Sequence, residues 1–110
     1  MSPGETTHDL AEERSLAIHR LIARRLRDDP SLVSMARSRV EGWLADGSVH
    51  PTYAEAWREL LRGPMDRLQD VLSSPDQAAR ALRQCSPFAG FVDPRTRWRI
   101  WSEVRAGRAR

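Results

Sequence analysis

The stretch "SLVSMARSRVEGWLADGSVHPTYAEAWRELLRGP", residues 31–64, decides the fold class. It contains two runs in which apolar residues recur at helical spacing, and Gly47 and Pro51 separate them. Glycine is typical of the position just after a helix and proline of the first helical turn, so the break reads as one helix ending and another beginning. Ser31 stands where it could cap the first helix, and Gly63-Pro64 ends the second. The apolar positions are Val33, Ala36, Val40, Trp43 and Leu44 in the first run, and Tyr53, Trp57, Leu60 and Leu61 in the second.

The residues on both sides of this stretch also show helical periodicity. Asp9 to Asp28 reads as an amphipathic helix, and further helices are expected at residues 65–72, from Ser74-Pro75-Asp76 onward, and from about Pro94 with Asp93 as its cap. No run of residues alternates in the manner of a strand. The sequence therefore predicts an all-α fold: a compact single-domain bundle of about five to six short helices. This helical domain is expected at residues 9–105, between a disordered lead at residues 1–8 and a basic tail at residues 106–110.

Length and composition limit the class of protein. A chain of 110 residues with 40% apolar and 30% charged residues suits one globular domain. No apolar run approaches the roughly 20 residues that a membrane-spanning helix needs. The first residues, "MSPGETTHDLAEER", lack the basic and apolar regions of a secretory signal. We therefore expect no membrane association and a cytoplasmic location.

The positive charge of the chain lies at its C-terminal end. The net charge is +3, and all the basic residues are arginines. Residues 95–110 alone contain six arginines and one glutamate, so the remainder of the chain is slightly acidic. This segment is the part of the sequence best suited to an acidic surface or to phosphate groups.

Residue patterns typical of catalysis or metal binding are missing from the sequence. His8, His19 and His50 lie in three different segments, and we expect each at the surface or at its boundary. Cys85 is the only cysteine, which excludes an intramolecular disulfide and a cysteine-based metal site. The glycines are scattered and form no phosphate-binding loop. We therefore expect no enzyme activity, no cofactor and no metal.

The stretch "LRQCSPFAGFVDPRTRWRIW", residues 82–101, concentrates aromatic residues and arginines. Its Pro and Gly residues predict a loop between Cys85 and Asp93 that displays Phe88 and Phe91, which either fill the core or face a partner. In the helix that follows, Trp98, Trp101 and Val104 are spaced three apart and predict an apolar stripe in the core, whereas Arg95 and Arg99 share another face.

The chain resembles a known family in three segments: "RSLAIHRLIARRLRDDPSLVSMARSRVEGWLADG", "YAEAWRELL" and "ALRQCSPFAGFVDPRTRWRIW". The family consists of small helical proteins encoded beside nucleotidyltransferase-like toxins of the AbiEii class. The likeness covers residues 14–104, and its most specific parts are "LRQ-x-SPFAG" and "R-x-RW-x-IW". The resemblance implies a non-catalytic antitoxin that binds its cognate nucleotidyltransferase-like toxin and prevents the toxin from modifying RNA.

An antitoxin of this kind needs a binding surface rather than an active site. We place that surface at the loop and the start of the last helix, on Phe88, Phe91, Arg95, Arg97 and Arg99, because charge and aromatic residues gather there. One alternative is a DNA- or RNA-binding regulator of helix-turn-helix type that contacts nucleic acid through the C-terminal arginines. Another is a helical interaction module with a different role.

Overall fold

The structure, a computed structural model, describes residues 3–108, and within them it contains six α-helices and no strand. The helices are α1 (Pro3–Asp28), α2 (Ser31–Asp46), α3 (Pro51–Arg62), α4 (Met65–Ser73), α5 (Gln77–Arg83) and α6 (Pro94–Arg108). The predicted all-α single-domain bundle is therefore confirmed.

The first and last helices are longer than the sequence indicated. Helix α1 begins at Pro3 instead of Asp9, so residues 3–8 of the predicted lead form its first turns. Helix α6 continues to Arg108, so residues 106–108 of the predicted tail belong to it. Residues 1–2 of the predicted lead and 109–110 of the predicted tail lie outside the described residues.

The break between α2 and α3 has the local chemistry expected for it. Gly47 ends α2 with a φ of 74°, in the left-handed region that glycine adopts without steric cost, and its N–H donates to the Trp43 carbonyl. Pro51 is the first residue of α3, and the ring Nδ1 of His50 caps this helix by accepting from the Thr52 N–H at 3.2 Å. The prediction that Ser31 caps α2 is wrong, because Ser31 is the first residue of the helix and the residue before it makes no side-chain cap hydrogen bond.

Aspartate carboxylates accept hydrogen bonds from backbone N–H groups at the starts of three helices. The Asp29 carboxylate accepts from the N–H of Ser31, which is the first residue of α2. Asp76 caps α5 by accepting from the Ala79 N–H at 2.8 Å. Asp93 caps α6, as predicted, by accepting from the Thr96 N–H at 3.0 Å. An aspartate suits these positions because the first N–H groups of a helix have no partner within it.

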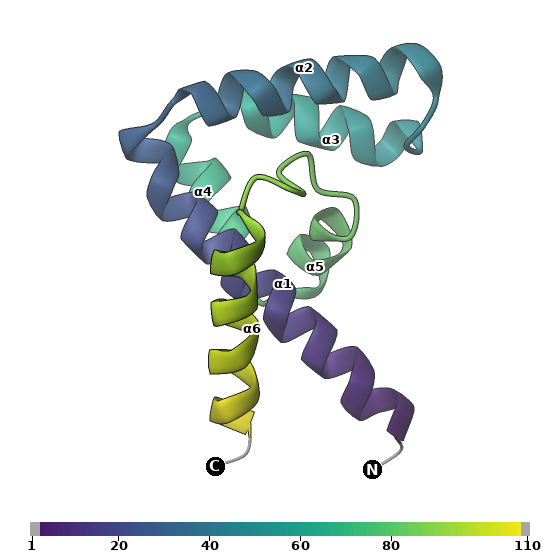
Figure 1. Ribbon diagram of the computed structural model, residues 1–110. Helices are drawn as coiled ribbons and strands as arrows, with labels where there is room; N and C mark the ends of the chain where they lie inside the picture. The colour runs from purple at the N-terminus through teal and green to yellow at the C-terminus, as the bar shows by residue number, and fades with distance from the viewer. Residues whose placement is uncertain (1–2, 109–110) are drawn as a thin grey trace.

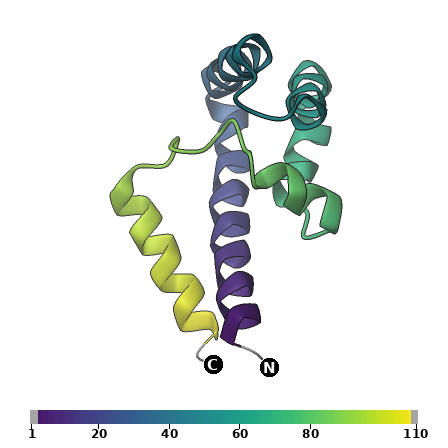
Figure 2. The same ribbon diagram turned by 90° about the vertical axis from the view of Figure 1, so that its right-hand side faces the viewer.

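Helix α1 is the central element of the molecule (Figure 1). Helices α2 and α3 lie side by side in opposite directions and cover one end of the fold. Figure 2 shows α6 on one side of α1 and α4 with α5 on the other. Helix α6 runs back along α1 in the opposite direction, so the first turn of α1 and the last turn of α6 both lie at the end away from α2 and α3.

The core lies where α1, α2, α3, α4 and the loop at residues 84–93 meet. Trp57 is completely buried and packs edge-to-face against Phe88, with the ring centroids 6.2 Å apart. Its indole N–H donates to the Leu82 carbonyl at 3.1 Å, so the polar end of the side chain is also satisfied. Fully buried aliphatic side chains surround this pair: Ile22, Leu26, Val40, Leu61, Leu68 and Leu72. Each contributes about 1.5–3 kcal/mol by leaving water.

No helix in the described part of the chain combines the length and the apolar character that a membrane span requires.

Candidate functional site

The loop at residues 84–93 is fixed to the core by side chains from helices that are distant in sequence. Phe88 is completely buried between Trp57 and Phe91, and the two phenylalanine rings meet edge-to-face at 5.7 Å. The Arg39 guanidinium of α2 donates to the carbonyls of Pro87 at 3.1 Å and Ala89 at 2.7 Å. The same guanidinium lies 4.9 Å from the centre of the Phe91 ring. The loop therefore closes the core.

This burial corrects the assignment of Phe88 to a partner-binding face. An anchor for a partner must be exposed in the free protein, and Phe88 has no exposed surface. Phe91 is half-buried and keeps part of its ring accessible beside Arg39. Of the two phenylalanines, only Phe91 remains available to a partner.

His19 lies beneath this loop and is buried, whereas the sequence predicted it at the surface or at its boundary. The Ser15 carbonyl is 2.7 Å from Nδ1 and can only accept, so Nδ1 carries the hydrogen. Nε2 then accepts from the Ser86 hydroxyl at 2.8 Å, and that hydroxyl accepts from the Phe88 N–H at 3.0 Å. Burial lowers the pKa of His19, the Ser15 carbonyl opposes this, and the charge of Arg83 lowers it further. His19 thus acts as a neutral link between α1 and the loop.

Helix α6 presents two different faces. Arg95, Trp98 and Arg99 point outward and form what we call the outer face of α6; Trp98 is 63% exposed. Ile100 is buried against α1, and Arg97 and Trp101 are half-buried. The prediction that Trp98 belongs to the core is therefore wrong. Each step of three residues turns the helix back by about 60°, so Trp98 and Val104 stand about 120° apart and share no stripe.

The three arginines assigned to the partner face do not lie together. Arg95 and Arg99 are exposed and make no ion pair with any described residue. Arg97 turns toward α1, where its guanidinium lies 5.5 Å from the centre of the Trp101 ring. Arg14 of α1 approaches the same ring at 5.0 Å. Only Arg95 and Arg99 therefore remain with Trp98 on the outer face of α6.

A cavity of about 380 Å³ lies between α1, α6 and the loop at residues 84–93. Its walls include three arginines, the Trp101 ring and the linked pair of His19 and Ser86. This cavity could not be predicted from the sequence, because Arg14 and Arg83 lie on separate helices and belong to no motif. The spacing of four between Arg97 and Trp101 is a weak signal, because Arg39 with Trp43 and Arg95 with Trp98 also stand at helical spacing without lining the cavity.

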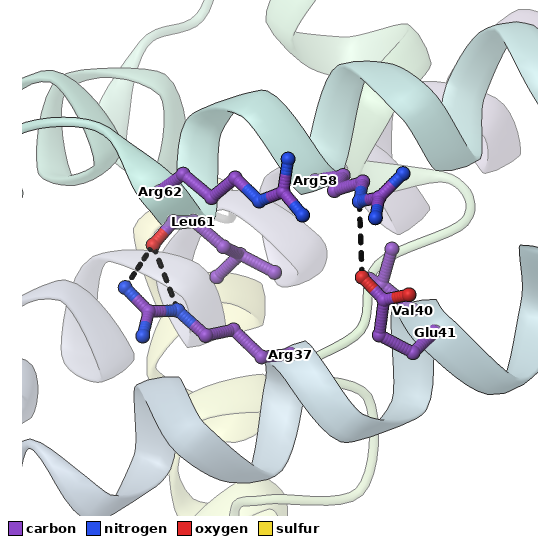
Figure 3. Close-up of a pocket in the computed structure, with 6 residues that line it drawn as sticks. All are labelled: Arg37, Val40, Glu41, Arg58, Leu61 and Arg62. Carbon is purple, nitrogen blue, oxygen red and sulfur yellow. Dashed lines mark hydrogen bonds and ion pairs between the residues drawn. The ribbon is translucent and has the colours of Figure 1, made fainter.

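A second hollow, of about 290 Å³, lies between α2 and α3 (Figure 3). The Arg37 guanidinium donates to the Leu61 carbonyl at 3.0 Å and 2.7 Å, which satisfies an end of α3. Arg58 pairs with Glu41 at 3.0 Å across the two helices. The contacts of Arg37 with Leu61 and of Arg58 with Glu41 hold α2 against α3.

The described residues contain no group of three or more His, Cys, Asp and Glu side chains placed to hold a metal ion. The candidate site consists instead of the outer face of α6 and the cavity behind the same helix. Comparison of the chain with models of protein families, with curated proteins and with solved structures gives no match.

Proposed function

We propose that this protein is a non-catalytic antitoxin that binds and neutralises a nucleotidyltransferase-type toxin through the outer face of α6. The observation that carries the proposal is the 63% exposure of Trp98 on a face that also holds two arginines with no acidic partner among the described residues. The resemblance in sequence supplies the class of partner.

The outer face of α6 has the chemistry of a binding hot spot. Tryptophan and arginine are the residues most enriched where truncation costs the most binding energy. A tryptophan ring can bury 150–250 Å² in a partner, and it sits here on a helix, so little order has to be gained on binding. Arg95 and Arg99 can form bidentate pairs with carboxylates. A nucleotidyltransferase offers such carboxylates, because it holds its metal ions with acidic residues.

The test pairs this chain with the nucleotidyltransferase-like protein encoded beside its gene. We expect the two to form a stable complex and co-expression to restore the growth of cells that make the toxin. Trp98→Ala should weaken the complex by roughly 30-fold, as expected for a hot-spot tryptophan. Tyr53→Ala, at an aromatic residue that is 40% exposed on α3, is the matched control and should leave affinity unchanged.

Two further results decide the proposal. The double variant Arg95→Ala/Arg99→Ala should also weaken binding, while Arg67→Ala, at an exposed arginine of α4, should not. Circular dichroism establishes that each variant is folded. Absence of such a neighbouring protein, or equal neutralisation by wild type and Trp98→Ala, would contradict the proposal.

Single-stranded nucleic acid is a second candidate partner, favoured by the same exposed Trp98. Nucleotide bases stack on exposed aromatic rings, and arginines beside the ring can contact the phosphates. Titration of Trp fluorescence with a short oligonucleotide separates the two functions. If nucleic acid is the partner, Trp98→Phe should retain binding, Trp98→Ala should lose it, and affinity should fall steeply with salt.

A helix-turn-helix function receives less support. The motif sets two helices at a wide angle so that the second can enter the major groove, whereas α2 and α3 lie side by side. The buried face of α3 includes Trp57 and Leu61, and its exposed residues include acidic Glu55 and Glu59. Neither helix of the pair offers an uninterrupted basic face to DNA.

A further inference from the structure

The cavity between α1, α6 and the loop at residues 84–93 has walls that suit one kind of small molecule. We propose that it binds a small organic anion: a carboxylate, sulfonate or phosphate ester that carries a compact apolar body. This site is separate from the outer face of α6 and goes beyond the proposed function, because it requires no protein partner.

The charge of the cavity walls favours an anionic ligand. Arg14, Arg83 and Arg97 come from three different helices and all line the cavity. Among the described residues that line it, none is acidic. Three guanidinium groups around one space attract an anion and repel a cation.

The residues that line the cavity also include hydrogen-bond donors that lack acceptors in the described part of the chain. The Nε atoms of Arg14 and Arg83 and the indole Nε1 of Trp101 are buried, and none has an acceptor among the described residues. All three are donors, and a buried donor without an acceptor costs about 1–3 kcal/mol. Because these three residues line the cavity, its wall holds these unpaired donors, which favours a ligand rich in acceptor atoms.

The side chain of Arg83 is held in one orientation in the cavity wall. Its side chain is 4% exposed, and Nη1 donates to the carbonyls of Val71 at 3.1 Å and Ser74 at 2.5 Å. These bonds hold the guanidinium in place, so its unpaired Nε–H keeps one direction. A guanidinium held in this way adds its charge to the cavity wall with little loss of side-chain entropy on binding.

Size and shape limit the remainder of the ligand. A volume of about 380 Å³ is at the small end of the range for ligand-binding pockets. Ile18, Val92 and the Trp101 ring provide apolar wall next to the arginines. The anionic group is expected at the arginines, and a planar or aliphatic body of a few carbon atoms is expected against the apolar wall.

The first probe is 8-anilinonaphthalene-1-sulfonate, a fluorescent molecule that combines an anionic group with an apolar body. Its matched control is N-phenyl-1-naphthylamine, which has the same rings without the sulfonate. We expect the sulfonate to bind the folded protein with one-to-one stoichiometry and the control to bind at least tenfold more weakly. Equal binding of both molecules, or no binding of the sulfonate at millimolar concentration, would overturn the proposal.

Variants then place the probe in the cavity. Arg97→Gln should weaken sulfonate binding by roughly tenfold, because it removes one charged donor from the wall. Arg95→Gln is the matched control: it removes an arginine from the outer face of the same helix and should have no effect. If both variants weaken binding equally, the sulfonate binds by general attraction to α6 and the cavity is not its site.

A spectroscopic measurement gives a readout that does not depend on affinity. The Trp101 indole N–H signal in a nitrogen–proton NMR spectrum, assigned by its loss in Trp101→Phe, should shift on addition of the sulfonate. The signal of Trp98 should stay in place, since Trp98 faces away from the cavity. If Arg97→Gln is unstable, Trp101→Phe serves as the cavity variant in its place, because it keeps an aromatic ring in the cavity wall. A shift at Trp98 without one at Trp101 would overturn the proposal.

Discussion

His19 makes the stability of the fold depend on pH. Its pKa is lowered in the folded state, and its neutral ring accepts from Ser86 beside the charged Arg83. The unfolded chain therefore binds a proton at a higher pH than the folded chain does. Stability is full above the unfolded pKa of about 6.5 and is lost as the pH falls below that value toward the folded pKa. The free energy of unfolding should fall by up to about 1.4 kcal/mol per pH unit in this window.

Urea unfolding at pH 7.5, 6.5 and 5.5 measures this effect. His19→Gln should be less stable at pH 7.5, but its stability should change much less over the same window. His8 and His50 are unchanged in the variant, so the difference between the two pH profiles belongs to His19. Parallel profiles would contradict the prediction.

The two phenylalanines of the loop should differ in their contribution to stability. Phe88→Ala removes a fully buried ring from contact with Trp57 and should cost about 3–5 kcal/mol. Phe91 is only half-buried, so Phe91→Ala should cost less than half as much. Chemical denaturation of both variants measures the two losses. Equal losses would mean that Phe88 is not the side chain that closes the core.

Individual residues were predictable from the sequence where their partners are close in the chain. The cap formed by Asp93 and the turn at Gly47 depend on neighbours within four residues, and both were predicted correctly. His19 bonds to Ser86, 67 residues away, and nothing near His19 reveals that partner. Trp98 was placed wrongly for a different reason: hydrophobicity favours burial, but the rotation of the helix decides which side chain meets α1.

At the scale of elements, arginines join helices to one another by donating to backbone carbonyls. Arg39 of α2 holds the loop at residues 84–93 through Pro87 and Ala89, and Arg37 of the same helix bonds to Leu61 at the end of α3. Such carbonyls have no partner within their own segment, so the bonds satisfy groups that would otherwise need water. The arginine content of the chain therefore serves the fold as well as its surface.

Replacement of Arg39 should loosen the loop specifically. Arg39→Met keeps most of the aliphatic stem but removes the donors and the charge over Phe91, and it should cost about 1–2 kcal/mol. Hydrogen exchange should become faster at residues 84–93. Arg37→Met is the matched control and should speed exchange at the end of α3 instead. The same exchange pattern in both variants would show that neither arginine acts locally.

The helices themselves were predictable, but their contacts were not. Capping residues and prolines mark the starts of α3 and α6 within a few residues, and the apolar spacing of α3 identifies Trp57 as its buried anchor. The loop carried two possible readings, because two phenylalanines beside glycine and proline suit a core plug and a partner anchor equally. Packing against residues far away in sequence separates the two: Phe88 is completely buried against Trp57, and Phe91 is half-buried beside Arg39.

At the scale of the whole molecule, α6 is the element with the fewest supports. Helix α3 lies between α2 and α4 and contains the buried Trp57, whereas α6 packs mainly against α1. Among the described residues of α6, Ile100 is the only one that is buried. Few buried apolar contacts mean a low free energy of local opening. Helix α6 should therefore open without unfolding of the remaining helices.

Native-state hydrogen exchange tests this separation. Amides of α6 should exchange faster than those of α3, and Ile100→Ala should speed exchange in α6 by roughly 30-fold, equivalent to about 2 kcal/mol. Exchange in α3 should not change, because Ile100 is remote from the centre of the core. The outer face of α6 and the arginine-lined cavity belong to the same helix, so a partner on Trp98 or an anion beside Trp101 would each slow this opening. If α6 and α3 exchange at the same rate and respond equally to Ile100→Ala, the helices open as one unit and the prediction is wrong.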